Sequence, residues 1–267
     1  MAKFELTAEN YYSLDANNAY WSASLIKEFM DCPARACAEL RGEYERPKTT
    51  ALLVGGYIDA WFEGDEAYSL YVERYHDEIF QRNGKPRADF VKADEMINRA
   101  TSDPVFMEYM EGDKQVIMTA DIFGFPFKAK FDVFHPDRTV DLKTVKDFEP
   151  IYKPGQGRLS FADAWNWVFQ MALYQRIRAY NENNVLKPQY LNCITKQSPP
   201  DIDAIELDQE SLDAEMEVLQ EHMPLYDAYK QGVIEPPRCG RCAYCRQSKK
   251  LSKPTRLEYY RTGDIEE

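Results

Sequence analysis

The spacing of apolar residues divides the chain into helices that alternate with two groups of strands. Apolar residues that recur every three or four positions predict helices at 24–41, 50–63, 161–181 and 209–231, and over most of 66–112 outside a loop at 82–86. Apolar residues that alternate or run together between turn residues predict strands at 115–121, 125–133, 139–143, 189–195 and 203–207. Gly124 and the turn His135-Pro136-Asp137 would make the first three strands an antiparallel meander.

Local features add detail to the predicted helices. Ser24 is expected to cap the first helix, and Pro33 is expected to break it. Gly55 and Gly56 indicate that another element packs closely against the second helix. Trp165 is expected to contribute core contacts from helix 161–181.

The alternation of helices and strands, with no repeat and no clear linker, predicts one α/β domain over residues 1–267. Within it, 64–112 would be a helical insertion and 236–256 a cysteine-rich basic segment. A chain of 267 residues can bury a full core without disulfides, and its 13% aromatic content excludes a mainly disordered state. With no apolar run of ~20 residues and no apolar leader at the N-terminus, a cytoplasmic location without membrane contact is expected.

Charge is unevenly distributed along the chain. The formal net charge is −12, which by itself argues against a nucleic-acid-binding protein. Residues 238–256, however, hold seven basic residues and no acidic one. This asymmetry favours an anionic partner for that segment.

Three cysteines near the C-terminus have C-x-x-C-x-x-C spacing: Cys239, Cys242 and Cys245. This spacing favours one soft metal centre over the alternative, a redox pair. The best candidate for a fourth ligand is Cys32, because Cys32-Pro33 opens a helix whose N-terminus would stabilise a thiolate. Cys37 and Cys193 are expected to pack as small apolar side chains.

The stretch around the second and third strands carries the candidate catalytic chemistry. Asp132 ends one predicted strand, while Asp141 and Lys143 lie on one face of the next. A short hairpin would bring the two carboxylates together as a site for Mg²⁺ or Mn²⁺, with a lysine beside it. The alternative is a surface ion pair worth under ~1 kcal/mol.

Two helices add polar residues at a spacing of four. Gln170 and Tyr174 share one helix face and could donate hydrogen bonds to a phosphate, although Tyr174 is equally typical of a core residue. Asp59 and Glu63 lie on an otherwise apolar helix, where an acid is costly to bury unless a cation neutralises it.

Taken in order, these motifs resemble the PD-(D/E)xK nuclease superfamily in its RecB-like branch, and most of all the phage-type exodeoxyribonucleases of the RecE kind. The resemblance covers about residues 20–250. Its motifs are Gly55 to Asp59, Asp132, Asp141 with Lys143, Gln170 with Tyr174, and Cys32 with the three later cysteines. Many members of this branch have a histidine where this chain has Asp59, and Glu63 is the alternative ligand.

The resemblance implies a restriction-endonuclease-like core, in which a central mixed sheet is flanked by helices. It also implies a metal-dependent DNA exonuclease acting in end resection for recombination. Asp59, Asp132, Asp141 and the Leu142 carbonyl would hold Mg²⁺ or Mn²⁺. Lys143, Gln170 and Tyr174 would complete the catalytic set. The four cysteines would hold a [4Fe–4S] cluster, with structural Zn²⁺ as the alternative.

Further expectations concern the partners. Lys128, Lys130 and the basic segment would line the DNA path. The resemblance also implies a recombination (annealing) protein as a partner and a homo-oligomeric state. The alternative functions are a non-catalytic nucleic-acid-binding module on the same fold and a related endonuclease or CRISPR-adaptation-type nuclease.

Overall fold

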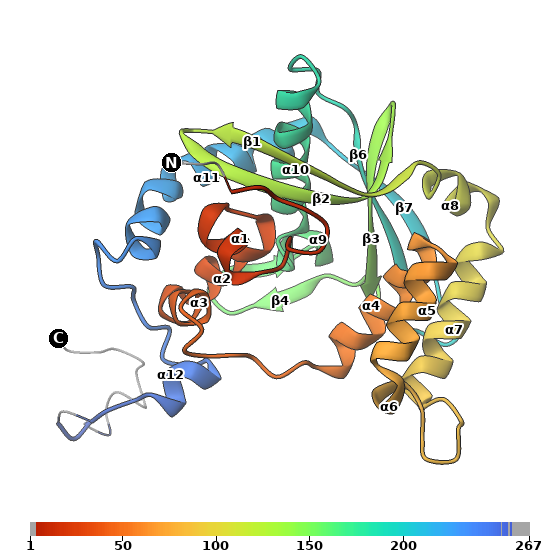
Figure 1. The fold of residues 1–267 in the computed structure, drawn as a ribbon, viewed down its shortest axis with the longest axis horizontal. Helices are drawn as coiled ribbons and strands as arrows, with labels where there is room; N and C mark the ends of the chain where they lie inside the picture. The colour runs from red at the N-terminus through yellow and green to blue at the C-terminus, as the bar shows by residue number, and fades with distance from the viewer. Residues whose placement is uncertain (1–3, 252, 256, 258–267) are drawn as a thin grey trace.

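The computed structural model describes residues 4–251, 253–255 and 257. Its centre is a mixed five-stranded sheet in the order β1-β2-β3-β6-β7, in which only β3 and β6 run parallel (Figure 1). The strands are β1 (Asp113–Ile122), β2 (Phe125–His135), β3 (Arg138–Val145), β6 (Gln189–Thr195) and β7 (Ile202–Leu207). All five correspond to the strands expected from the sequence; β6 has the predicted bounds and the other four are slightly longer.

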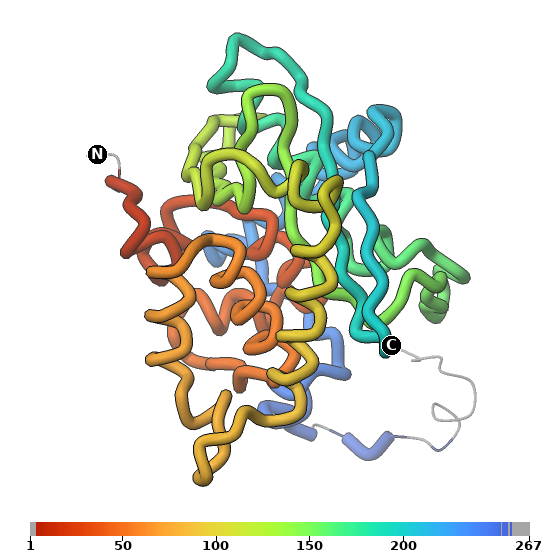
Figure 2. The backbone as a smooth tube through the Cα atoms, turned by 90° about the vertical axis from the view of Figure 1, so that its right-hand side faces the viewer, coloured from red at the N-terminus to blue at the C-terminus, as the bar shows by residue number. Residues whose placement is uncertain are grey.

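Helices cover both faces of this sheet. The first face is covered by α2 (Ala23–Asp31), α3 (Pro33–Leu40), α10 (Trp167–Asn181) and α11 (Gln209–Lys230). The second face is covered by α4 (Thr50–Glu63), α6 (His76–Ile79), α7 (Ala88–Thr101) and α8 (Pro104–Tyr109). Helix α5 (Asp65–Arg74) packs against α4, and Figure 2 shows this group, orange to yellow, gathered on one side of the molecule.

Each face has its own apolar core. Cys193 belongs to the first core and Ile194 to the second, which follows because neighbouring residues of a strand point to opposite sides. Cys37 is buried in the first core as well. Both cysteines therefore pack as the sequence predicts.

Three short elements lie outside the sequence expectations: α1 (Leu14–Ala19) and the two strands of a second sheet, β4 (Ile151–Lys153) and β5 (Gly157–Leu159). Helix α9 (Phe161–Ala164) is the start of the helix predicted at 161–181. Elements of three to six residues hold too few positions to show a period. The last helix, α12 (Ala243–Gln247), lies within the cysteine segment.

Three details of the predicted helices are wrong. The hydroxyl of Ser22, not Ser24, accepts the N–H of Leu25 and caps α2. Helix 161–181 is not continuous, because Asn166 has a left-handed backbone (φ 53°) that separates α9 from α10. Trp165 lies at this break with 57% of its surface exposed, so it is not a core residue.

Two other helix predictions are confirmed. The break near Pro33 is confirmed, since α2 ends at Asp31, Cys32 lies between the two helices and Pro33 begins α3. A Cβ at Gly56 would lie 2.7 Å from the hydroxyl of Tyr71 on α5, so a side chain there would have to displace that ring; at Gly55 the nearest atom, Thr144 Oγ1, is at an ordinary 3.8 Å. Among the described residues, no helix combines the length and apolar character needed to cross a membrane.

Candidate active site and candidate metal centre

The predicted acid pair meets where β2 and β3 separate. Their antiparallel pairing ends at Val133 opposite Val140, and the next positions along the two strands are Asp132 and Asp141. Asp132 Oδ2 accepts the N–H of Leu142 at 3.1 Å. Asp141 is 1% exposed and forms an ion pair with Lys143 on the same face of β3. The structure therefore brings the two aspartates and the lysine to one point.

The backbone is irregular at Asp132 and at Gln115, which lies opposite Asp132 on β1. Phe131 packs in the first core and Val133 in the second, although residues two apart on a regular strand face the same side. Gln115 has a left-handed backbone (φ 55°) and lies unpaired between Lys114, which is opposite Val133, and Val116, which is opposite Phe131. Left-handed backbone costs free energy for a residue with a side chain, and such strain gathers at functional sites.

Asp59 and Asp132 share a small cavity with the backbone of β3. Its lining includes Asp59, Glu63, Gln115, Asp132 and Leu142. Desolvation first, and then Asp141, raise the pKa of Asp132 well above its ordinary value. Desolvation raises the pKa of Asp59 to about 7, and the charge of Lys143 partly opposes this rise. Asp59 also retains contact with solvent, which screens its charge. Several acids that resist ionising together are chemically suited to a divalent cation.

The metal-free protein should be stabilised when Asp132 is replaced by asparagine. The raised pKa means that the folded state binds a proton that the unfolded state has lost, so wild-type stability falls as pH rises through that range. The asparagine side chain keeps an acceptor for Leu142 N–H but carries no charge. At pH 8 we expect the melting temperature of Asp132→Asn to be higher by about 2–4 °C, the shift that ~1 kcal/mol gives a domain of this size.

The same experiment carries its own control. The difference between the two proteins should shrink as the pH falls toward 4, where the wild-type carboxyl is protonated. Thermal melts in chelator-treated buffer from pH 4 to pH 8 measure both quantities. A variant less stable than wild type at pH 8 would mean that the Asp132 charge stabilises the empty site.

Gln170 and Lys27 extend the network on the first face. Gln170 Nε2 donates to Asp141 Oδ1 at 2.9 Å, and Gln170 Oε1 accepts from Lys27 Nζ at 2.7 Å. The other oxygen, Asp141 Oδ2, is buried and paired with Lys143 Nζ. The sequence pattern did not single out Lys27, because a lysine on the polar face of an amphipathic helix gives no signal of its own.

Tyr174 lies beside the acid pair and in the core at once. Its ring contacts Phe131, with centroids 5.0 Å apart. Burial first, and then Tyr11, Asp141 and Asp132, raise the pKa of its hydroxyl, which therefore stays protonated. Tyr174 therefore packs against the first core while its hydroxyl lies near Asp141 and Asp132.

An open cleft of about 720 Å³ extends from Asp59 and Lys143. Its walls are α4, the end of β3 and the break between α9 and α10. The exposed Trp165 and Lys196 line it, as do Lys146 and Asp147, which form an ion pair at 3.0 Å. Lys143 and Lys196 thus lie in one cleft beside an exposed indole ring.

Lys128 does not line an open path, contrary to the sequence expectation. It is 1% exposed, and its Nζ donates to the Tyr11 carbonyl and to Asn17 Oδ1. Lys130 Nζ lies 4.9 Å from the ring centroid of Tyr12. These amines hold the N-terminal segment against β2, because a buried ammonium needs acceptors.

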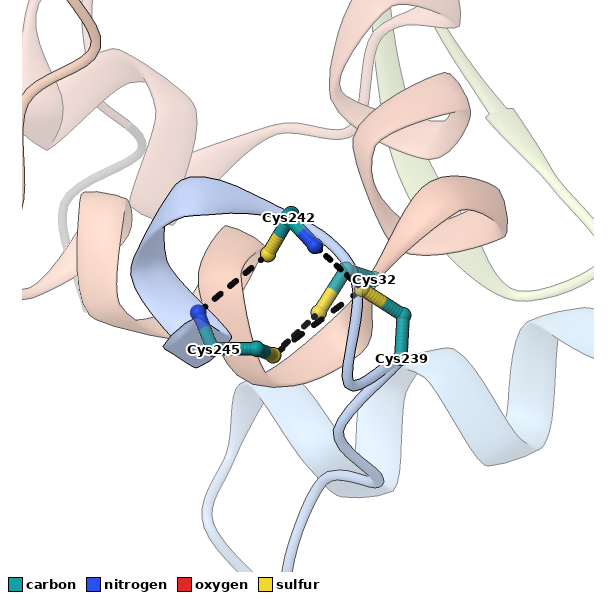
Figure 3. A group of neighbouring side chains, drawn as sticks. All are labelled: Cys32, Cys239, Cys242 and Cys245. Carbon is teal, nitrogen blue, oxygen red and sulfur yellow. Dashed lines mark hydrogen bonds between the residues drawn. The ribbon is translucent and has the colours of Figure 1, made fainter. Parts of the chain in front are cut away.

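The four predicted cysteines form one cluster. The ligand atoms of Cys32, Cys239, Cys242 and Cys245 all lie within 4.8 Å of one another. Figure 3 shows the four side chains gathered at one place. Cys32 Sγ and Cys245 Sγ are 3.6 Å apart, and Cys239 Sγ and Cys245 Sγ 3.9 Å. Burial opposes ionisation of Cys239, but the N–H groups of Cys242 and Arg241 outweigh it and hold its pKa at about 6.

This donor set fits a metal. Zn–S bonds of about 2.3 Å in a tetrahedron separate the sulfurs by roughly 3.8 Å, so Zn²⁺ would fit these positions directly. An iron–sulfur cluster also takes four thiolates, and it would require the sulfurs to move apart. Cys32 caps the N-terminus of α3, Cys239 and Cys242 precede α12, and Cys245 lies within α12. The cluster therefore joins segments near the two ends of the chain.

The comparisons with known proteins agree with this architecture. The profile of a family described as "PDDEXK-like domain of unknown function (DUF3799)" matches residues 22–248. The crystal structure of a "putative exonuclease" from Eubacterium rectale superposes with a TM-score of 0.92 at 36% sequence identity, covering 98% of this chain and 100% of that chain. A search of curated proteins found no match. The chain therefore belongs to the PDDEXK-like domain family and has its nuclease fold.

Proposed function

We propose that the protein is a DNA exonuclease that depends on Mg²⁺ or Mn²⁺. The observation that supports this most is the convergence of Asp132, Asp141 and Lys143 where β2 and β3 separate. Family membership and the likeness to a protein described as an exonuclease support the reaction class.

Asp132 and Asp141 would hold the cation, together with Asp59 and the Leu142 carbonyl. The residues fit this role, because Asp141 and Asp59 lie close enough to Asp132 to raise its pKa, and carboxylate oxygens are the ligands that such hard cations take. The N–H and C=O of a strand residue point to the same side. Leu142, whose N–H faces Asp132, would therefore direct its carbonyl to that side as well. The bound ion would polarise the scissile phosphate and activate a water molecule.

Lys143 would act as a fixed positive charge. Burial alone would lower its pKa, but Asp141 and Asp132 outweigh burial and raise it above the ordinary value. Lys143 is therefore an ammonium at neutral pH, able to stabilise charge that develops on the phosphate. Gln170 would orient Asp141, to which it donates a hydrogen bond, and the Tyr174 hydroxyl would donate a hydrogen bond to a phosphate oxygen.

The cleft beside Lys143 is the best path for the substrate strand. We propose that Lys196 neutralises a phosphate there and that a base stacks on Trp165. The basic segment 238–256 is a second candidate for contact with DNA, and Arg256 within it lies outside the described residues. The acidic balance of the whole chain favours binding confined to such local surfaces.

Replacing Trp165 with alanine should weaken binding of single-stranded oligonucleotides. Stacking on one aromatic ring is worth about 1–3 kcal/mol per base, so we expect at least a roughly tenfold rise in Kd. Fluorescence anisotropy in Ca²⁺ would measure this. Tyr180→Ala is the matched control, since Tyr180 is an exposed aromatic on α10 outside the cleft lining. Equal affinities of both variants and wild type would exclude a stacking role for Trp165.

A digestion assay tests the proposed function itself. With Mn²⁺, end-labelled linear duplex DNA should be degraded from its ends, while closed circular DNA should survive and chelator should stop the reaction. Binding without digestion would favour the non-catalytic module, and cleavage of the circle would favour an endonuclease. The resection role, an annealing-protein partner and homo-oligomerisation are further proposals that rest on the resemblance alone.

A further inference from the structure

Lys27 lies at the start of a chain of hydrogen bonds that ends at the metal-binding carboxylate. Its Nζ donates to Gln170 Oε1 at 2.7 Å, and Gln170 Nε2 donates to Asp141 Oδ1 at 2.9 Å. The three residues come from α2, α10 and β3, which are distant in the sequence. The amide of Gln170 is therefore held between an amine and a carboxylate.

The orientation of this amide has chemical consequences. A glutamine side chain accepts at Oε1 and donates at Nε2, so rotating it by half a turn would place an oxygen against Asp141 and an N–H group against Lys27. Desolvation, and then Lys143, lower the pKa of Lys27 to about 7, and the amine can donate in either protonation state. Lys27 thus disfavours the reversed amide.

The fixed amide also gives the two oxygens of Asp141 different partners. Oδ1 accepts from Gln170, whereas Oδ2 is buried and paired with Lys143. A carboxylate held in this way presents Oδ2 in one direction. Groups that orient a metal ligand from behind typically change metal affinity by about 10–100-fold when they are removed.

We propose that Lys27 is a positioning residue of the nuclease site, which acts through the amide of Gln170 to hold Asp141 ready for a divalent cation. The proposal rests on the proposed function, because it needs Asp141 to bind that ion. It assigns to α2 a role in the active site in addition to its packing against α10.

Mn²⁺ affinity, measured by titration calorimetry without DNA, tests this role independently of activity. Lys27→Met keeps a side chain of similar length but removes the donor, and it should weaken Mn²⁺ binding about tenfold or more. Lys27→Arg keeps a donor and should recover most of that loss. Gln170→Leu should weaken binding to a similar extent, and adding Lys27→Met to it should have little further effect, because both changes break one chain.

The outcomes separate the role of Lys27 from general damage. The metal content of the four-cysteine centre and the melting temperature of each variant show whether the fold is intact. If Lys27→Met does not fold, Lys27→Arg and Gln170→Leu carry the comparison. Unchanged Mn²⁺ affinity in a folded Lys27→Met variant, or losses that add in the double variant, would overturn the proposal. Wild-type protein that binds no Mn²⁺ and digests no DNA would overturn the proposed function with it.

Discussion

Lys143→Ala is expected to reduce DNA digestion by about 10²–10³-fold while the fold survives. The size follows from removing a fixed positive charge from a site where negative charge develops in the transition state. Lys143 is largely buried and paired with Asp141, so water cannot replace its charge effectively. Single-turnover digestion of end-labelled duplex DNA with excess enzyme would measure the chemical step.

Two controls sharpen this test. Lys85→Ala removes an exposed lysine from the loop between α6 and α7 and should keep the wild-type rate. Circular dichroism and thermal melts of Lys143→Ala should show a folded protein. A folded Lys143→Ala variant that digests DNA at the wild-type rate would remove Lys143 from the mechanism.

Cys32→Ala is expected to lose the metal centre and much of the stability at the junction of the chain ends. Structural zinc contributes about 10–16 kcal/mol of apparent binding free energy in zinc-finger peptides. This domain has two apolar cores besides its metal centre, so we expect a large drop in melting temperature rather than complete unfolding. Elemental analysis and thermal melts would follow both effects.

Cys37→Ala is the matched control, because Cys37 is buried on the same helix but lies outside the four-sulfur cluster. It should retain the metal. Stoichiometric zinc in colourless wild-type protein would identify a zinc site, whereas brown protein absorbing near ~400 nm would identify a cluster. Metal content unchanged by Cys32→Ala would show that Cys32 is not a ligand.

The parts of the fold that the sequence predicts are those governed by periodic burial. Val140, Leu142 and Ile194 alternate with residues of the opposite face, so the strands are visible without a structure. A break such as that at Asn166 is harder to predict. Apolar residues continue at helical spacing through it, whereas a single left-handed residue leaves no periodic signal.

Some features of the candidate site also follow from the sequence, whereas others depend on tertiary contacts. The short turn between β2 and β3 predicts that Asp132 and Asp141 approach, because antiparallel register fixes which residues are opposite. The separation of the strands at that point depends on tertiary contacts, and so does the left-handed backbone of Gln115. Lys27 becomes visible only when α2 packs against α10. Lys128 is buried instead of lining the DNA path, because the spacing of a strand predicts which face a side chain is on but not which residues cover that face.

The binding of a divalent cation between Asp132 and Asp141 is most directly tested by a crystal grown with Mn²⁺ and an anomalous difference map. We expect a peak within about 2.1–2.3 Å of oxygens from both aspartates, with the Leu142 carbonyl also in contact. A fully occupied crystal with no peak there, under conditions in which the protein digests linear DNA, would contradict it.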